Sequence, residues 1–471
     1  MKNLETVQWV DMVFGQCDLG DPRRLARLKD YAARQSEAPT ASTFGACEGD
    51  VAATEGAYRF LRNKAVKAKN IDRGVALSTV ELCKGRKTLL AIQDSTSVAL
   101  AHVPLRDGLK EKGCPTGFMV HSTLMADGDT GEVIGLIDQV RWIRPKDRPD
   151  KSMRKERNYE DKESFRWEES SRRVAELLVD ASNAITVCDR EADIFDYLQY
   201  HLDNNSRFVM RASQDRALEK GVKLWQKMED LPVVGYREIK IAQRGPWKPE
   251  FEKTREGRKA RSARLELRAG VITLPFPSRQ EIKESITVNV VYVKELNPPD
   301  GREPLIWRLF TSEPVDTLAL VSRVVGFYEQ RWLIEEFHKC WKVGCRLEER
   351  PFQSLDAVET LIAITAPIGA RLLQFQCMAD VSPDAPANKM LTLEELECLH
   401  AMTKPGTPMP KAPPTNKEVY HTIAKLGGWM DTKRTGRVGW QAIWKGWSRF
   451  QDRFFGWKLA KTAAGPSALY L

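Results

Sequence analysis

The stretch FYEQRWLIEEFHKCWKVG, residues 327–344, has the periodicity of a single amphipathic α-helix. At 3.6 residues per turn, one side of this helix would be apolar and would pack against a core. The opposite side would present a phenol, a guanidinium, a carboxylate and an ammonium within about 60° of one another. A carboxylate can bind a divalent metal, and the other three groups can bind phosphate oxygens. The apolar side comprises Leu333, Ile334, Phe337 and Trp341, and the polar side comprises Tyr328, Arg331, Glu335 and Lys342.

A polar helix face of this kind is, taken alone, more often a solvated surface with ion pairs one turn apart. Two aspartates earlier in the chain fall at predicted strand ends. Residues 88–93 form an apolar run that predicts a buried strand ending at Asp94, and residues 184–188 predict another ending at Asp189. Ligands of α/β sheets gather at strand ends, and carboxylates such as Asp94, Asp189 and Glu335 suit Mg²⁺ or Mn²⁺.

The elements around the two aspartates are predicted to alternate in a defined order. Three strands are followed by a helix, a strand, a second helix and a fifth strand, which is the order of an RNase H-like domain. The predicted strands span residues 88–93, 118–125, 133–142, 184–188 and 207–211, and the predicted helices span residues 163–181 and 191–202.

Residues from about 215 to 310 interrupt the path from the fifth strand to the helix at 327. Alternating and β-branched runs at 236–241, 263–267, 285–293 and 306–311 predict a β-rich insertion there. Within it, residues 237–268 hold eleven Lys or Arg against five Asp or Glu. Because phosphate neutralisation needs positive charge without special geometry, this stretch is a candidate contact with a DNA backbone. The basic, proline-containing loop at 144–157 is either a DNA contact or a solvated loop.

The first 70 residues are predicted to be helical. Asp21-Pro22 has the residues of a helix start, and a second helix is predicted after Asp50. Arginines on short helices can bind phosphates, although an ordinary basic surface fits the sequence equally well. The candidate DNA-binding arginines are Arg23, Arg24, Arg27, Arg59 and Arg62.

The last third of the chain is also predicted to be helical. Residues 355–374 are strongly apolar and predict a buried helix, and Thr392-Leu-Glu-Glu395 predicts a capping box that opens another. The segment 404–417 contains five prolines and is predicted to be a linker. The tryptophans that follow suit either a packed helical subdomain or an interface.

Composition narrows the class of protein. With 471 residues and 42% hydrophobic residues, the chain is long enough for two or three domains, and its net charge of +9 suggests a polyanionic partner. The nine cysteines show no metal-binding spacing and suit a reducing cytosol. No run of eighteen apolar residues, Walker loop or H-E-x-x-H motif occurs, so the sequence predicts a protein that neither spans a membrane nor uses ATP or zinc.

The motifs together resemble those of DDE cut-and-paste bacterial transposases with the Y-R-E-K signature, the Tn-five type. The resemblance rests on Tyr-x2-Arg-x3-Glu-x6-Lys at 328–342, LLAIQDSTS around Asp94 and ITVCDREADI around Asp189, and it spans residues 19–436. It implies an α/β fold with an RNase H-like (retroviral-integrase superfamily) catalytic core. It also implies three domains: a helical DNA-binding domain at 1–70, the catalytic domain with its insertion at 71–372, and a helical, dimerising domain at 373–471.

The resemblance further implies a two-metal reaction. Asp94, Asp189 and Glu335 would bind two Mg²⁺ ions, or Mn²⁺ in their place, for hydrolytic nicking and then transesterification through a hairpin on the transposon end. Tyr328, Arg331, Lys342 and Arg211 would contact DNA near the reacting phosphate. Trp307 would stack on a flipped base and Trp332 would brace a displaced one, although Trp307 is equally well explained as a core residue.

The partners implied are double-stranded DNA with transposon end repeats, target DNA, and a second copy of the chain in a synaptic complex. The expected location is the bacterial cytoplasm, at the nucleoid. Two alternatives are an RNase H-like nuclease without strand transfer and a non-cleaving or domesticated end-binding protein. The second would be expected to have lost a carboxylate, and all three are present.

Overall fold

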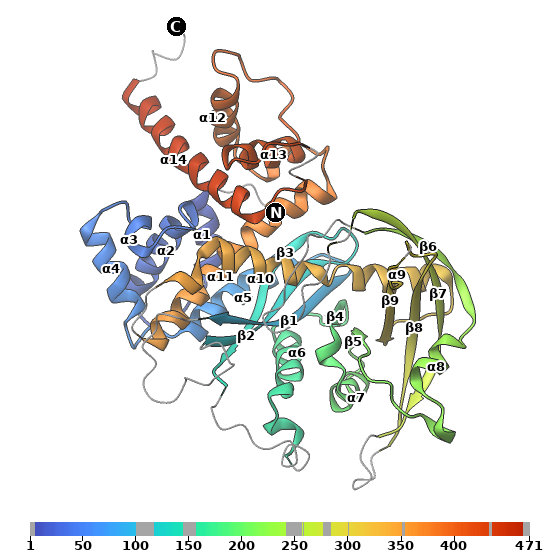
Figure 1. Cartoon of the computed structure of the whole chain (residues 1–471). Coiled ribbons are helices and arrows are strands. Elements are labelled where there is room, and N and C mark those ends of the chain that lie inside the picture. Colours follow the sequence, from blue (N-terminus) through green and yellow to red (C-terminus); the bar gives the residue numbers. More distant parts are fainter. Residues whose placement is uncertain are drawn as a thin grey trace. The chain divides into compact units, whose positions relative to one another are not determined.

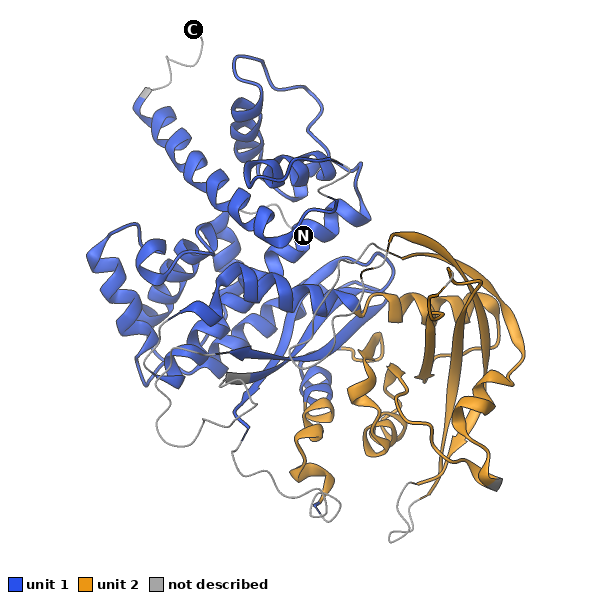
Figure 2. Ribbon diagram, in the orientation of Figure 1, with its two compact units in different colours: residues 1–157, 170–179, 332–471 blue, residues 158–169, 180–331 orange. Residues whose placement is uncertain are grey.

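The structure is a computed structural model that describes residues 5–99, 117–144, 157–241, 257, 259–276, 284–299, 301–350, 354–432 and 436–464. The chain divides into two compact units (Figure 2). The first comprises residues 1–157, 170–179 and 332–471, and the second comprises residues 158–169 and 180–331.

The first unit contains a three-stranded antiparallel sheet in the order β3-β2-β1. The strands are β1 (Leu89–Ala99), β2 (Gly117–Asp127) and β3 (Val133–Trp142). The prediction that β1 ends at Asp94 is wrong, because pairing with β2 continues to Ala99, opposite Gly117. Asp94 therefore lies in the middle of β1, opposite Ser122, at the point where the strand changes from fully buried to half-buried. The residues beyond it, Ser-Thr-Ser-Val, include β-branched side chains that extend the strand readily.

Two helices in the N-terminal part of the first unit begin where the sequence predicts. Asp21 caps α2, with its side chain accepting a hydrogen bond from the Arg23 amide, and Asp50 caps α4 through the Ala53 amide. Its helices are α1 (Thr6–Phe14), α2 (Pro22–Glu37), α3 (Thr43–Ala46), α4 (Val51–Leu61) and α5 (Ala68–Cys83) (Figure 1).

The C-terminal part of the first unit is also helical. Its helices are α10 (Trp332–Cys345), α11 (Leu355–Val381), α12 (Leu393–Thr403), α13 (Asn416–Leu426) and α14 (Trp440–Ala464), with short 3₁₀ turns at Leu347–Glu349 and Ala387–Lys389 (Figure 1). The capping box at Thr392 is confirmed, since its side chain and that of Glu395 bond each other's backbone amides. By length and composition α11 could cross a membrane, but its most apolar window is entirely buried inside the protein. A core helix of a soluble protein has the same properties.

The second unit contains six strands in the order β4-β5-β9-β8-β7-β6. The short strands β4 and β5 are parallel, and the four strands of the predicted insertion continue from β5 as an antiparallel sheet. The predicted insertion is therefore joined to the β4–β5 pair through β9. The bounds are β4 (Ala184–Cys188), β5 (Arg207–Arg211), β6 (Val233–Ile241), β7 (Arg261–Leu274), β8 (Ile286–Leu296) and β9 (Ile306–Thr311).

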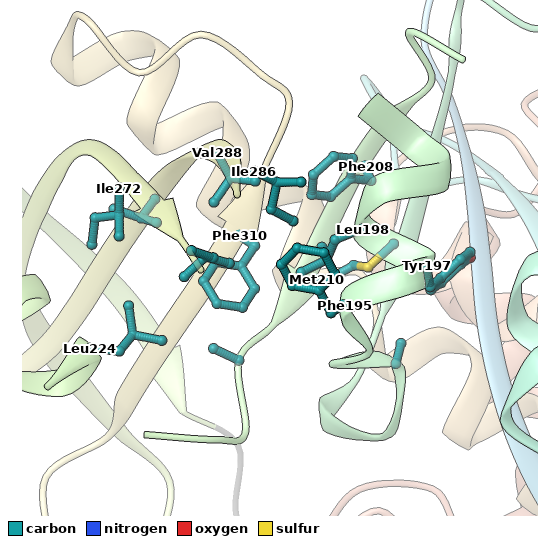
Figure 3. Close-up of a cluster of buried hydrophobic side chains, with 14 of the residues drawn as sticks. Phe195, Tyr197, Leu198, Phe208, Met210, Leu224, Ile272, Ile286, Val288 and Phe310 are labelled. Atoms are coloured by element: carbon teal, nitrogen blue, oxygen red, sulfur yellow. The ribbon is translucent and has the colours of Figure 1, made fainter. Parts of the chain in front are cut away.

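Helices of the second unit pack against these strands around one apolar core. Phe195 and Leu198 of α7 meet Phe208 and Met210 of β5 and Phe310 of β9 in this core (Figure 3). The helices are α7 (Phe195–Asp203), α8 (Leu224–Glu229) and α9 (Leu318–Glu329), with 3₁₀ turns at Tyr159–Asp161, Glu163–Phe165, Arg190–Ala192 and Glu219–Gly221. The helix α6 (Arg166–Leu177) begins in this unit and continues into the first.

The single helix predicted over residues 327–344 is wrong. In the structure α9 ends at Glu329 and α10 begins at Trp332. The amides of Gln330 and Arg331 bond the carbonyls of Phe327 and Tyr328, three residues back, so the helical ladder tightens and stops there. The predicted apolar side is nevertheless confirmed. Its four residues, Leu333, Ile334, Phe337 and Trp341, are all buried.

Candidate active site

Asp94 lies on β1 in the sheet of the first unit, at the point where this strand becomes accessible to solvent. Its carboxylate is half-buried and its Oδ1 accepts a hydrogen bond of 2.8 Å from the amide of Ser95. The residues before it on β1 are fully buried, which fixes the strand in the core. A carboxylate held in this way stays oriented at the surface of a rigid element.

Glu335 and Lys342 lie on α10 in the same unit as Asp94. Glu335 is half-buried in the first turn of the helix. Lys342, two turns later, donates from Nζ to Thr96 Oγ1 at 3.0 Å and to the Ser97 carbonyl at 3.2 Å. These bonds join α10 to the end of β1 that follows Asp94. Burial lowers the pKa of Lys342, and nearby Glu348 partly offsets that effect.

The other polar residues of α10 have structural partners. Glu336 accepts hydrogen bonds from Lys339 at 2.8 Å and from the indole of Trp440 at 3.0 Å. His338 is buried, and desolvation lowers its pKa to about 3. Trp332, predicted to brace a base, is half-buried at the start of α10 with the Arg437 guanidinium 5.4 Å from its ring centre.

Asp189 belongs to the second unit and directly follows β4, as predicted. Its Oδ1 accepts a 2.8 Å hydrogen bond from the amide of Glu191, so the carboxylate caps the 3₁₀ turn that starts at Arg190. Glu191 itself is exposed and is paired with Arg166 at 3.1 Å. Asp193 is buried against Arg216 and is therefore structural.

Four predicted DNA-binding residues meet beside Asp189 in the second unit. The rings of Trp307 and Tyr328 contact each other edge to face, with their centres 5.3 Å apart, and the Arg331 guanidinium lies 5.9 Å from the Tyr328 ring. Arg211 donates to the Ile306 carbonyl at 3.1 Å. Burial raises the pKa of Tyr328; Arg331 and Arg211 oppose this effect, and the charge of Asp189 adds to it. The tyrosine is thus a neutral phenol between two cations.

The candidate DNA-binding arginines near the N-terminus differ in their exposure and in the groups that they contact. Arg23 and Arg59 are largely exposed; Arg23 pairs with Asp21, the cap of α2, and Arg59 pairs with Glu55 of α4. Such surface pairs contribute little to stability and can exchange for phosphate. Of the other three, Arg24 donates to the Leu19 carbonyl at 2.9 Å, Arg27 pairs with Asp30 at 3.2 Å, and Arg62 lies 5.5 Å from the Tyr58 ring. The predicted DNA-contacting loop at 144–157 lies, apart from its two end residues, outside the described residues.

The sequence did not identify the layer of polar residues that runs alongside Asp94 on β1 and β2. Gln93 and Ser95 flank it on β1, and His121 and Thr123 lie beside them on β2. Their alternation along two otherwise apolar strands is the signal that one face of the sheet carries a polar layer.

Hard carboxylate oxygens are the donors that Mg²⁺ and Mn²⁺ prefer, so the donor chemistry of Asp94, Asp189 and Glu335 fits such an ion. Asp94 and Glu335 belong to the first unit and Asp189 to the second. Within either unit's described residues, no group of three or more His, Cys, Asp or Glu is placed to hold a metal by itself.

Two family models match separate parts of the chain. Residues 6–66 match the family model described as "Transposase DNA-binding", and residues 168–368 match the one described as "Transposase DDE domain". The second match includes Asp189 and Glu335 and begins beyond Asp94. The two matches support a DDE transposase, a DNA-binding enzyme whose DDE domain has an RNase H-like fold.

One solved structure is also similar to the chain: "Cryo-EM structure of piggyBac transposase synaptic complex with hairpin DNA (SNHP)". The similarity covers 97% of this chain and 80% of that one, with 8% sequence identity and a TM-score of 0.38. A score of this size is too low to establish a common fold, and the two family matches remain the basis of the classification.

Proposed function

We propose that the chain is a DNA transposase of the Tn-five type that binds transposon ends, cuts them and joins them to target DNA. The observation that carries the proposal is that the chain contains both a DNA-binding and a DDE domain match together with Asp94, Asp189, Glu335 and the Tyr-Arg-Glu-Lys set. A protein that only bound ends would have no need of the three carboxylates.

In this proposal Asp94, Asp189 and Glu335 would hold two Mg²⁺ ions, which Mn²⁺ could replace. When bound, such ions activate the attacking oxygen and stabilise the leaving oxygen of an in-line displacement. The first displacement hydrolyses a phosphodiester, so water supplies the oxygen and a 3′-OH leaves. In the second, that 3′-OH attacks the opposite strand and closes a hairpin, which releases another 3′-OH.

The remaining residues bind and orient the DNA. Lys342, Arg331 and Arg211 bring positive charge to phosphate oxygens, and the neutral phenol of Tyr328 donates a hydrogen bond. Trp307 offers a half-buried ring on which an unstacked base can stack, and Trp332 braces a displaced base. The arginines of α2 and α4 bind the end sequence. Two copies bridge two ends, at the nucleoid of a bacterial cytoplasm.

The test uses the full chain, Mg²⁺ and linear DNA that ends in the repeats flanking its gene, with the products resolved on a denaturing gel. Nicked and hairpin-ended fragments are expected. Glu335→Ala should abolish cutting while end binding persists, because Glu335 lies on α10 and the DNA-binding match covers residues 6–66. Asp94→Asn should fold and bind but not cut.

A matched control is Glu336→Gln, which alters the neighbouring carboxylate that bonds Lys339 and Trp440. It should still cut. Full activity of Glu335→Ala or Asp94→Asn would remove that residue from the site. Binding without any strand break in either metal would favour the end-binding alternative, and nicks that never proceed to hairpins would favour the nuclease.

A further inference from the structure

A chain of hydrogen bonds links Ser171 of α6 to the Ser95 side chain, and the backbone of Ser95 carries it on to the carboxylate of Asp94. Gln93 Nε2 donates to Ser171 Oγ of α6 at 2.9 Å, and Gln93 Oε1 lies 3.1 Å from His121 Nε2. His121 Nδ1 lies 3.0 Å from Ser95 Oγ, and the Ser95 amide donates to Asp94 Oδ1 at 2.8 Å. All of these residues belong to the first unit.

The direction of the bonds follows from the groups involved. A carboxamide oxygen can only accept, so His121 Nε2 must carry a proton and donate to Gln93 Oε1. In the neutral ring Nδ1 is then an acceptor, and the Ser95 hydroxyl donates to it. His121 and Gln93 are completely buried. A buried imidazole with both nitrogens bonded holds its neighbours in one arrangement.

We propose that His121 is a positioning residue for Asp94. It fixes the Ser95 side chain, and through Ser95 it fixes the backbone amide that orients the Asp94 carboxylate. The inference rests on the proposed role of Asp94 as a metal ligand. Groups that orient metal ligands in this way change metal affinity or activity by about 10- to 100-fold when they are removed.

The same polar layer supplies a matched control. Thr123, two residues after His121 on β2 and equally buried, bonds Ser170 Oγ at 2.7 Å. Ser170 in turn donates to Asp138, which is also bound by Arg173. This second chain fastens α6 to the sheet but leads to Asp138 rather than to Asp94.

The experiment compares the parent, His121→Asn, Ser95→Ala and Thr123→Val, each bound to end DNA. Mn²⁺ binding is followed by the loss of the free-ion signal in electron paramagnetic resonance, and nicking is measured against Mg²⁺ concentration. His121→Asn and Ser95→Ala should weaken Mn²⁺ binding about tenfold and raise the Mg²⁺ needed for half-maximal nicking about as much. Saturating Mg²⁺ should restore much of the rate. Thr123→Val should match the parent in both measurements. The half-exposed Ser95 variant keeps the test open if His121→Asn fails to fold.

Each outcome bears on a separate claim. Unchanged metal binding and nicking in both His121→Asn and Ser95→Ala would overturn the positioning role, and so would an equal defect in Thr123→Val. If the parent binds Mn²⁺ but never cuts, the proposed function fails while the binding comparison still decides the role of His121. A parent complex that binds no Mn²⁺ would overturn both.

Discussion

The buried arginine Arg350 should be a major link between the N-terminal helices and α10. Arg350 directly follows the 3₁₀ turn that comes after α10, and it is only 6% exposed. The guanidinium donates to the Cys345 carbonyl at the end of α10, at 2.9 Å, and to Gln35 Oε1 of α2, at 3.1 Å. It also donates to the carbonyls of Pro39 and Ala41, at 3.2 and 2.9 Å.

The expected loss in Arg350→Met follows from these four bonds. At about 1 kcal/mol net for each, they contribute about 4 kcal/mol to the free energy of unfolding. Three of the acceptors keep another donor, since Tyr31 bonds Gln35 Oε1 and the Gln35 amide bonds both loop carbonyls. Only the Cys345 carbonyl loses a side-chain partner outright, so little penalty for unsatisfied acceptors is added and the loss should be that of the four bonds, about 4 kcal/mol.

Urea unfolding followed by tryptophan fluorescence measures this change, and proteolysis near residues 38–41 reports whether the loop loosens. Arg346→Met is the matched control, because Arg346 is an exposed arginine that pairs only with nearby Glu349 among its described ion pairs. It should unfold close to the parent. Equal unfolding midpoints for Arg350→Met and the parent would refute the reasoning.

Two further predictions concern packing and pH. A Cβ on Gly344 of α10 would lie within about 2 Å of the Trp444 ring of α14, so Gly344→Ala should destabilise the protein by about 3 kcal/mol. Gly456→Ala is the control, because a Cβ there would meet open space and the variant should be as stable as the parent or more so. Thermal melting measures both. Burial lowers the pKa of His201 from 6.5 to about 3, and both ring nitrogens lack partners. The contribution of the neutral His201 ring to folding stability is therefore fully present above pH 6.5. That contribution is lost as the pH falls toward 3. At pH 5 the parent should have lost about 2 kcal/mol of stability in this way. The melting temperature of His201→Phe should therefore fall less than that of the parent between pH 7 and pH 5. An equal fall in the two proteins would contradict this prediction.

Several elements could be predicted from local sequence because local chemistry determines them. The strand at 133–142 and the short strands before Asp189 and through Arg211 are predicted with the bounds observed, since each is a β-branched or apolar run between turn residues. The caps at Asp21 and Thr392 also form as predicted, and α4 begins after Asp50 as predicted. In each case the determining contacts lie within a few residues of one another.

Long-range contacts account for what the sequence left undetermined. Asp94 lies within a strand because β2 continues to pair beyond it, and no property of β1 alone indicates how long its partner is. The bonds of His121 and Arg350 join segments that are tens to hundreds of residues apart. The hydrophobic periodicity of the sequence can indicate that a residue is buried, but it does not identify the distant residue that it bonds.

The break between α9 and α10 changes how the Tyr-Arg-Glu-Lys set should be understood. Tyr328 and Glu335 have compatible helical phases, yet the helix that carries the tyrosine ends before the helix that carries the glutamate begins. Their spacing in the sequence therefore does not reflect neighbouring turns of one helix. Instead, each is oriented by its own surroundings: Tyr328 contacts Trp307 within the second unit, and α10 is fastened to β1 through Lys342 in the first. It follows that substitutions at Trp307 and at Lys342 should disturb different parts of the set, even though a helical wheel places all four residues on one face.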